Sequence, residues 1–181
     1  MLTDLQIQKL TKFFSMYDTN CDGFLVAHDF EQIVKKLADL KHLGHRSSQY
    51  LALDDRFTRF WKSLEAHADT NHDHKISLEE WLVYYETVLS DDQKYQEELH
   101  TVMDIVFEVF DDNGDEKISP EEWGHLLTIY NVSPVYAPAI FKQLDRNEDG
   151  FLDRSELMEL IYHFFYSNDA NDFANRMFGP Y

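Results

Sequence analysis

The chain has 181 residues and a formal net charge of −18, from 34 acidic and 16 basic side chains. So much negative charge argues against nucleic acid or an anionic membrane as the main partner. The hydrophobic fraction of 44% and the aromatic fraction of 15% exclude a disordered acidic tail and indicate one large domain or two small lobes.

The cellular compartment follows from what the sequence lacks. Cys21 is the only cysteine, so an intramolecular disulfide is impossible, which fits a reducing compartment. The N-terminus has no basic segment followed by an apolar block, and no apolar run approaches the roughly 20 residues of a membrane span. We expect a soluble, cytoplasmic, monomeric protein with no membrane span.

The first predicted helix precedes Asp18. Leu5, Leu10 and Phe13 recur at helical spacing, and Thr3 with Gln6 has the spacing of a capping box. The helix leads into an acidic stretch, DTNCDGFLVAHD, at residues 18–29. Acidic and amide side chains at its first, third and fifth positions are typical of a calcium-binding loop.

Three further stretches along the chain repeat this pattern. They read DTNHDHKISLEE at residues 69–80, DDNGDEKISPEE at 111–122 and DRNEDGFLDRSE at 145–156. All four resemble D-x-[DN]-x-[DN]-G-x₅-E, the EF-hand loop between two helices. The fourth loop matches at every specified position, and each of the others departs at one. Four loops in register are strong evidence of a repeat, although one alone would be weak.

The segments between the loops read as helices. Ser77 with Glu80 and Ser119 with Glu122 have capping-box spacing after the second and third loops, and Ser133 with Pro134 is expected to open the next helix in the same way. The widest spacing, between the first two loops, predicts lengthened helices there.

The fold class follows from these elements. We predict an all-α fold of four EF-hand helix–loop–helix units in two closely packed lobes, with short loop–loop β pairings. The first lobe is residues 1–90, with loops 18–29 and 69–80; the second is residues 91–181, with loops 111–122 and 145–156 and a tail packed in an interlobe or helix cleft.

The ligand chemistry indicates calcium, which takes six to eight oxygen ligands. Side chains at positions one, three, five and twelve supply oxygens, and position seven supplies its main-chain carbonyl. The predicted ligands are Asp18, Asn20, Asp22, Phe24 and Asp29; Asp69, Asn71, Asp73, Lys75 and Glu80; Asp111, Asn113, Asp115, Lys117 and Glu122; and Asp145, Asn147, Asp149, Phe151 and Glu156. Ser77, Ser119 and Asp153, at position nine, are predicted to bind directly or through water.

Two loops lack the glycine at position six and carry His74 or Glu116 instead. A left-handed conformation costs a residue with a side chain roughly 1–2 kcal/mol, which corresponds to about a tenfold loss of affinity. Histidine is among the residues enriched at positive φ, and glutamate is less suited to it. Because all side-chain ligands are intact, we predict that both loops bind calcium.

The first loop ends in Asp29, one methylene shorter than glutamate. Aspartate reaches the ion through both oxygens only if the loop contracts, and a single contact suits the smaller Mg²⁺. Val26 at position nine adds no side-chain oxygen. Two alternatives stay open for this loop, a Mg²⁺ or weak Ca²⁺ site and a vacant one. The cofactor prediction is three to four Ca²⁺ ions, with Mg²⁺ most expected at loop 18–29.

The four loops, the long first spacing and the ending FFYSNDANDFANRMFGPY resemble the invertebrate sarcoplasmic calcium-binding proteins and their calexcitin branch. The resemblance extends over nearly the whole chain. It implies a compact two-lobe cytosolic Ca²⁺ buffer, with a signalling role in the calexcitin branch and often one inactive loop. It implies no enzymatic activity, and the protein target is left open.

Two other functions compete with this interpretation. Coelenterazine-binding proteins and photoproteins share the fold and hold a small apolar ligand, but here Phe165 stands where a tryptophan is expected and His163 is not at the matching offset. A calmodulin-like sensor needs a groove rich in methionine, and the chain has five methionines. Because the tail carries Phe173, Met177, Phe178 and Tyr181, we predict that it fills a hydrophobic cleft.

Overall fold

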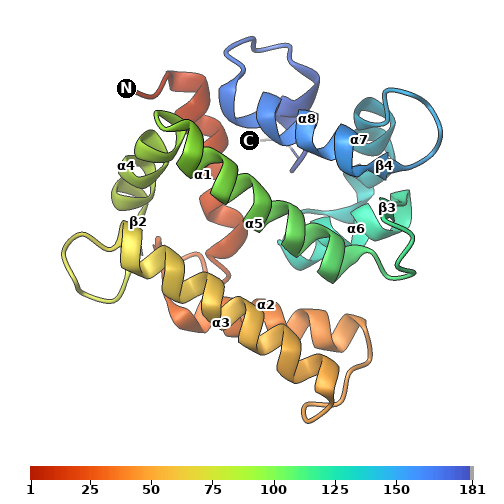
Figure 1. The fold of residues 1–181 in the computed structure, drawn as a ribbon, viewed down its shortest axis with the longest axis horizontal. Helices are drawn as coiled ribbons and strands as arrows, with labels where there is room; N and C mark the ends of the chain where they lie inside the picture. The colour runs from red at the N-terminus through yellow and green to blue at the C-terminus, as the bar shows by residue number, and fades with distance from the viewer. Residues whose placement is uncertain (180–181) are drawn as a thin grey trace. The chain divides into compact units, whose positions relative to one another are not determined.

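The computed structural model describes residues 1–179, and it confirms the all-α EF-hand fold (Figure 1). Among these residues, no helix is both long enough and apolar enough to span a membrane. The α-helices are α1 (Asp4–Tyr17), α2 (Ala27–Leu40), α3 (Ser48–Ala68), α4 (Leu78–Leu89), α5 (Asp92–Phe110), α6 (Pro120–Ile129), α7 (Ala137–Leu144) and α8 (Arg154–Tyr166), and two 3₁₀ turns are η1 (Pro134–Tyr136) and η2 (Phe173–Arg176).

Short antiparallel pairings join the loops two by two. β1 (Phe24–Leu25) pairs with β2 (Ile76–Ser77), and β3 (Lys117–Ile118) pairs with β4 (Leu152–Asp153). In each pairing the apolar residues at position eight of the two loops face each other, Leu25 with Ile76 and Ile118 with Leu152. All four of these side chains are fully buried, so each pair of loops is fastened to the core of its own unit.

The chain divides into two compact units, residues 13–85 and residues 1–12 with 86–181. The sequence placed the boundary near residue 90 and assigned the N-terminal residues to the first lobe. In the structure, residues 1–12 belong instead with the C-terminal half. Hydrogen bonds account for this: Gln6 Nε2 donates to the Phe165 carbonyl, and Thr3 Oγ1 donates to Asn168 Oδ1.

In the unit of residues 13–85, α2 runs beside α3 (Figure 1). α3 has 21 residues, which confirms the predicted lengthening between the first two loops. The core is rich in aromatic rings; Tyr17 stacks on Phe30 with ring centroids 5.5 Å apart, and Trp81 lies 5.5 Å from Phe13. Such pairs stabilise a core beyond the area they bury.

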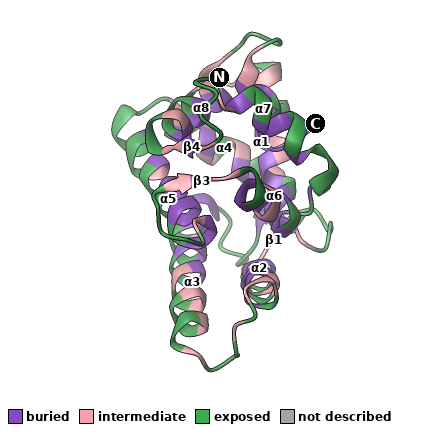
Figure 2. Ribbon diagram, turned by 90° about the vertical axis from the view of Figure 1, so that its right-hand side faces the viewer, coloured by how far each residue is buried: buried purple, intermediate pink, exposed green. Residues whose placement is uncertain are grey.

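In the other unit, α5 buries nine apolar side chains between Tyr95 and Phe110. Figure 2 shows buried residues along the helices and mostly exposed residues in the connecting loops.

Ser119 caps α6 as predicted, but Ser133 makes no side-chain cap and Pro134 begins the 3₁₀ turn η1 instead. The prediction that this pair opens a helix directly was therefore wrong, since α7 starts at Ala137.

The described part of the tail lies against helices of its own unit. Met177 and Phe178 are buried, and the Phe178 ring lies parallel to Trp123 with centroids 6.3 Å apart. The Phe178 centroid also lies 5.2 Å from that of Phe164 on α8, with the two rings nearly perpendicular. Tyr181 falls outside the described residues.

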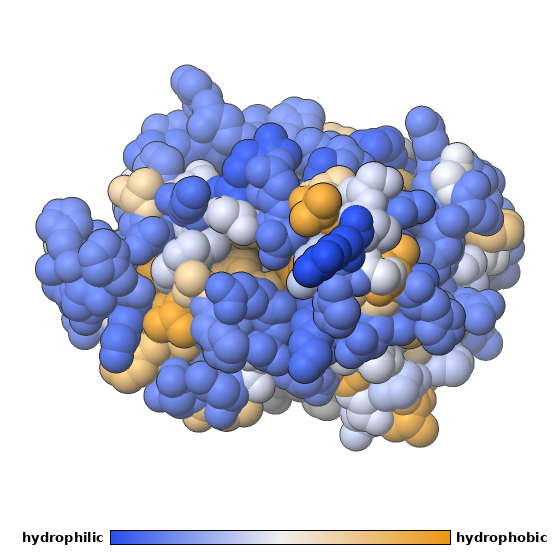
Figure 3. All heavy atoms as spheres, turned by 90° about the horizontal axis from the view of Figure 1, so that it is seen from below, coloured by the Kyte–Doolittle hydropathy of each residue, from blue (hydrophilic) through white to orange (hydrophobic). Residues whose placement is uncertain are grey.

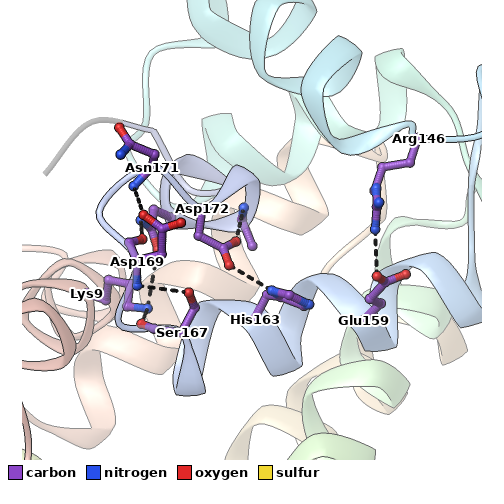
Figure 4. A network of polar contacts seen from close by, with 10 residues as sticks. Lys9, Arg146, Glu159, His163, Ser167, Asp169, Asn171 and Asp172 are labelled. Atoms are coloured by element: carbon purple, nitrogen blue, oxygen red, sulfur yellow. Dashed lines mark hydrogen bonds and ion pairs between the residues drawn. The ribbon is translucent and has the colours of Figure 1, made fainter.

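A buried lysine anchors this tail (Figure 4). Lys9 on α1 is 1% exposed, and its Nζ donates to the Ser167 carbonyl at 2.8 Å and to Asn175 Oδ1 at 3.3 Å. Beside it, His163 Nδ1 lies 2.8 Å from Asp172 Oδ2. Burial of the Lys9 ammonium lowers its pKa to about 8, and nearby Asp172 opposes part of that shift.

The lowered pKa of Lys9 predicts a pH dependence of stability. Between pH 8 and 10.5 the unfolded chain binds the Lys9 proton more tightly than the folded protein, so the free energy of unfolding contributed by Lys9 rises with pH. In denaturant titrations, we expect the unfolding free energy of the wild type minus that of Lys9→Met to increase as the pH rises across this window. A constant difference would contradict this assignment.

Candidate metal centre

The first residue of each loop, an aspartate, organises the turn behind it. In all four loops its Oδ2 accepts the N–H of position six at 2.9–3.0 Å. In three loops its Oδ1 also accepts a main-chain N–H from position four or five. The position-one carboxylate is therefore held at the centre of the turn.

Positions three and five repeat equally well. The asparagine Oδ1 at position three accepts the N–H of position five at 2.8–2.9 Å, and the aspartate Oδ1 at position five accepts the N–H of position seven at 2.9–3.0 Å. These are Asx turns, which Asn and Asp form readily. Because each turn spans two residues, the sequence spacing alone fixes them.

Position six has positive φ in every loop, as predicted. His74 has φ of 62° and Glu116 has φ of 60°, so both take the conformation that the pattern reserves for glycine. His74 also places Nδ1 2.8 Å from Glu65 Oε1, and this hydrogen bond, followed by the nearby negative charges, raises the pKa of His74. Histidine at position six is therefore compatible with an ordinary loop geometry.

Position four is a second left-handed position, which our sequence reasoning missed. Its occupants are Cys21, His72, Gly114 and Glu148, with φ between 58° and 72°. The signal was present in loop 111–122, where the glycine stands at position four instead of position six. Cys21 therefore has a conformational role in its turn, and it is exposed.

The carboxylate at position twelve closes each loop from the following helix. Glu80 Oε1 accepts the N–H and hydroxyl of Thr70, and its Oε2 accepts those of Ser77. Burial would raise the pKa of Glu80, but these hydrogen bonds outweigh it and lower the pKa. The group is thus a carboxylate at neutral pH, as a metal ligand must be.

Asp29 closes the first loop in the same way despite its shorter side chain. Its Oδ1 accepts from Thr19 N at 3.1 Å and its Oδ2 from Val26 N at 3.0 Å, the positions that Glu80 joins in the second loop. Asp29 is fully buried. Because one methylene is missing, the same contacts require the start of α2 to lie closer to the loop, which is the contraction that two-oxygen binding would need.

The three predicted ligands at position nine have another role in this structure. Ser77, Ser119 and Asp153 each accept the N–H three residues further on and so cap the helices that follow. The cap of α8 uses only Oδ1 of Asp153. Asp153 therefore remains the best proposed position-nine ligand, directly or through water.

The residues at position seven, predicted to offer carbonyls, also contact each other across each pair of loops. Lys75 Nζ lies 5.3 Å from the Phe24 ring centroid, and Lys117 Nζ lies 5.1 Å from that of Phe151. One loop of each pair supplies the cation and the other the ring. These side chains therefore help to hold the paired loops together.

A carboxylate oxygen without a hydrogen-bond partner in the fourth loop indicates whether a cation fits there. Oδ1 of Asp145 is buried and has no hydrogen-bond partner among the described residues, whereas the equivalent oxygens of the other loops have one. An unpaired buried carboxylate oxygen is costly. A divalent cation would satisfy it, together with Asn147, Asp149 and Glu156 from the same loop.

Comparison with known families identifies these loops. The description "EF-hand domain pair" matches residues 7–86, and "EF hand" matches residues 97–127 and 139–161, together more than half of the chain. The chain belongs to the EF-hand family. As an EF-hand protein it binds Ca²⁺, and the carboxylates described above fit that ion.

Within this family, the chain is similar over its length to sarcoplasmic calcium-binding proteins. It is 24% identical to "Sarcoplasmic calcium-binding proteins I, III, and IV" of Branchiostoma lanceolatum, covering 98% of each chain. It is 25% identical to "Calexcitin-1" of Caenorhabditis elegans, covering 96% of this chain and 85% of the relative. The resemblance read from the sequence is confirmed.

The fold also resembles that of a solved coelenterazine-binding protein. The calcium-loaded apo form of coelenterazine-binding protein from Renilla muelleri superposes with a TM-score of 0.76 at 21% identity, covering 99% of this chain and all of the other. This similarity concerns the fold.

His74→Gly should strengthen Ca²⁺ binding at loop 69–80 by up to about tenfold, because it removes roughly 1–2 kcal/mol of left-handed strain. Site-resolved calcium titration would measure the gain. His74→Ala, which removes the same imidazole but keeps a side chain at positive φ, is the matched control and should not strengthen the site. An unchanged or weaker affinity of the His74→Gly variant would show that the Glu65 hydrogen bond already offsets the strain.

Asp29→Glu should raise the preference of loop 18–29 for Ca²⁺ over Mg²⁺, because the longer side chain brings two oxygens to a larger ion without contraction. Competition titrations at millimolar Mg²⁺ would measure the ratio of affinities. If the wild-type loop already binds Ca²⁺ in excess Mg²⁺ as tightly as loop 145–156 does, the expected preference is wrong.

Proposed function

We propose that this EF-hand protein is a cytoplasmic, monomeric Ca²⁺ buffer that also modulates Ca²⁺ signals. Three ions would occupy loops 69–80, 111–122 and 145–156, and loop 18–29 would take Mg²⁺ or a weakly bound Ca²⁺. The observation that carries this proposal is the repetition of one hydrogen-bonded turn in four loops, three of which keep every ligand side chain of the pattern.

The packing of the tail favours a buffer over an open sensor. A sensor exposes a hydrophobic groove to a target helix when Ca²⁺ binds. Here Met177 and Phe178 of the same chain are buried, with the Phe178 ring against Trp123 and Phe164. A target helix would have to displace these contacts and the Lys9 anchor.

Calorimetric titration with Ca²⁺, with and without millimolar Mg²⁺, tests the proposal. We expect at least three Ca²⁺ sites in the absence of Mg²⁺ and no more than three at high Mg²⁺. Binding of a hydrophobic dye should fall or stay low as Ca²⁺ is added. A strong calcium-induced rise in dye binding by the full chain would favour the sensor.

A second candidate function is the binding of a small apolar ligand of the coelenterazine type, which the similarity of fold allows. The residues at the equivalent stretch argue against it. His163 is hydrogen-bonded to Asp172 in the tail, and Phe165 is buried in the core. Coelenterazine titration followed by tryptophan fluorescence separates the two functions, because a buffer should give no saturable change. Neither function involves nucleic acid.

A further inference from the structure

The second EF-hand departs from the other three at two positions whose side chains meet. Position six of its loop is His74, and the residue four places before the loop, on α3, is Glu65. The other three hands carry a buried phenylalanine at that helix position, Phe14, Phe107 and Phe141. A carboxylate at a place that the repeat fills with a core ring requires a polar partner, and here that partner is the histidine.

Asp69 completes a group of three possible metal ligands in the unit of residues 13–85. A carboxylate oxygen of Glu65, one of Asp69 and a ring nitrogen of His74 all lie within 4.8 Å of one another. Glu65 and Asp69 are four residues apart at the end of α3, so their side chains share one face. The His74 N–H donates to Asp69 Oδ2 at 3.0 Å, which holds the loop against that face.

The donor atoms of this group suit Zn²⁺ better than Ca²⁺. Zn²⁺ readily binds an imidazole nitrogen together with carboxylate oxygens, whereas Ca²⁺ takes oxygen ligands. Two ligands of a tetrahedral Zn²⁺ lie roughly 3.3 Å apart when their bonds are about 2.0–2.1 Å long. The 2.8 Å hydrogen bond between His74 Nδ1 and Glu65 Oε1 therefore has to open only slightly for the ion to replace its proton.

The group is buried on one side and open on the other. Asp69 is 6% exposed, and the side chain of Glu65 is 25% exposed, whereas that of His74 is 83% exposed. Two ligands are thus held by the helix, and the third reaches them from the solvent side. A water molecule can take the fourth position there, as in zinc sites with three protein ligands.

We propose that Glu65, Asp69 and His74 bind one Zn²⁺ ion, and that this ion competes with Ca²⁺ in loop 69–80. Asp69 is the proposed position-one ligand of that loop, so the two ions would share its carboxylate. Two dications beside one carboxylate repel each other, and each therefore weakens the binding of the other by the same factor. The competition rests on the proposed Ca²⁺ site in this loop, whereas the Zn²⁺ site itself does not.

The test uses the full chain in millimolar Mg²⁺, with Zn²⁺ as the probe. Calorimetry should show a Zn²⁺ site that saturates at submillimolar concentration, and the NMR signals of the His74 ring should shift in parallel. Saturating Zn²⁺ should then weaken Ca²⁺ binding at loop 69–80 about fivefold or more. Loops 111–122 and 145–156, which belong to the other unit, should keep their Ca²⁺ affinity within about twofold.

Substitutions separate this site from loose attraction of cations to an acidic protein. The side of the molecule shown in Figure 3 is mostly hydrophilic, and the chain carries a net charge of −18, so divalent ions gather near its surface in any case. His74→Gln and Glu65→Gln should each weaken Zn²⁺ binding at least about tenfold, the loss that is typical even for groups behind the ligands.

The matched controls are the same substitutions at a histidine and a glutamate of the same unit. His67 Nδ1 lies 2.6 Å from the Ser63 carbonyl, and Glu31 pairs with His28. Neither His67 nor Glu31 belongs to the group of three ligands. His67→Gln and Glu31→Gln should therefore leave Zn²⁺ binding unchanged within about twofold.

Two results would overturn the Zn²⁺ site. One is the absence of saturable binding at submillimolar Zn²⁺, and the other is binding that His67→Gln weakens as much as His74→Gln does, which describes an adventitious ion only. Zn²⁺ that binds without changing the Ca²⁺ affinity of loop 69–80 would overturn the sharing of Asp69. If this loop takes no Ca²⁺ even without Zn²⁺, the competition and the proposed function fail together, and the Zn²⁺ titration alone decides the site.

Discussion

Removal of residues 170–181 should destabilise the unit formed by residues 1–12 and the C-terminal half, and should expose apolar surface of that unit. The described part of this segment includes Met177 and Phe178, both buried, and burial of two such side chains contributes on the order of 3–6 kcal/mol. The deletion also removes the Asn175 acceptor and the nearby Asp172 charge from Lys9. Denaturant unfolding and dye binding in Ca²⁺ should show a large loss of stability and a several-fold rise in bound dye.

Two substitutions refine this experiment. Phe178→Ala should reproduce about half of the effect or more, because its ring contacts both Trp123 and Phe164. Arg176→Ala, at an exposed position in the same turn, is the matched control and should change stability by less than about 0.5 kcal/mol. Equal stability of the full and shortened chains would mean that the tail does not contribute to the core.

Glu156→Gln should nearly abolish Ca²⁺ binding at loop 145–156. This carboxylate is the proposed two-oxygen ligand, and loss of one charged partner in a paired site costs about 3 kcal/mol, which is roughly 100-fold in affinity. The partner loop 111–122 should weaken as well, because Ile118 and Leu152 join the two loops through β3 and β4. Calorimetry would follow the number of sites, and the fluorescence of Trp123 would report on the unit.

Glu159→Gln is the control for this substitution. Glu159 lies one turn further along α8 and pairs with Arg146 at 2.6 Å (Figure 4), but it is no proposed ligand. Its substitution should leave the site count unchanged. If Glu156→Gln and Glu159→Gln behave alike, the closing role of Glu156 in the fourth loop is wrong.

The geometry of the loops could be predicted from the sequence because it is local. Each turn is set by hydrogen bonds between residues two to ten positions apart, so D-x-N-x-D spacing fixes it wherever it occurs. Positive φ at His74 and Glu116 followed from alignment of the four loops. The same alignment carried the signal for position four, at Gly114, whose φ is 72°.

The assignment of chain segments to the two units was harder to predict from the sequence. The sequence placed residues 1–12 in the first lobe on the basis of chain order, but side-chain hydrogen bonds of Thr3, Gln6 and Lys9 join them to the last thirty residues. Position nine was another case. Capping-box spacing predicted the caps at Ser77 and Ser119, whereas the cap formed by Asp153, which was predicted only as a ligand, is known from the observed hydrogen bond.

The sequence by itself thus determined the all-α class, the four loops and the family, since these depend on short-range spacing that each segment carries alone. Only the tertiary structure decided that a lysine could be buried at position 9, because its acceptors, Ser167 and Asn175, are more than 150 residues away along the chain. The packing of α2 against α3 also creates a cavity beside Phe30 and Trp61, which neither helix could form alone. Contacts between distant segments arise from packing and loop closure, and no local pattern encodes them.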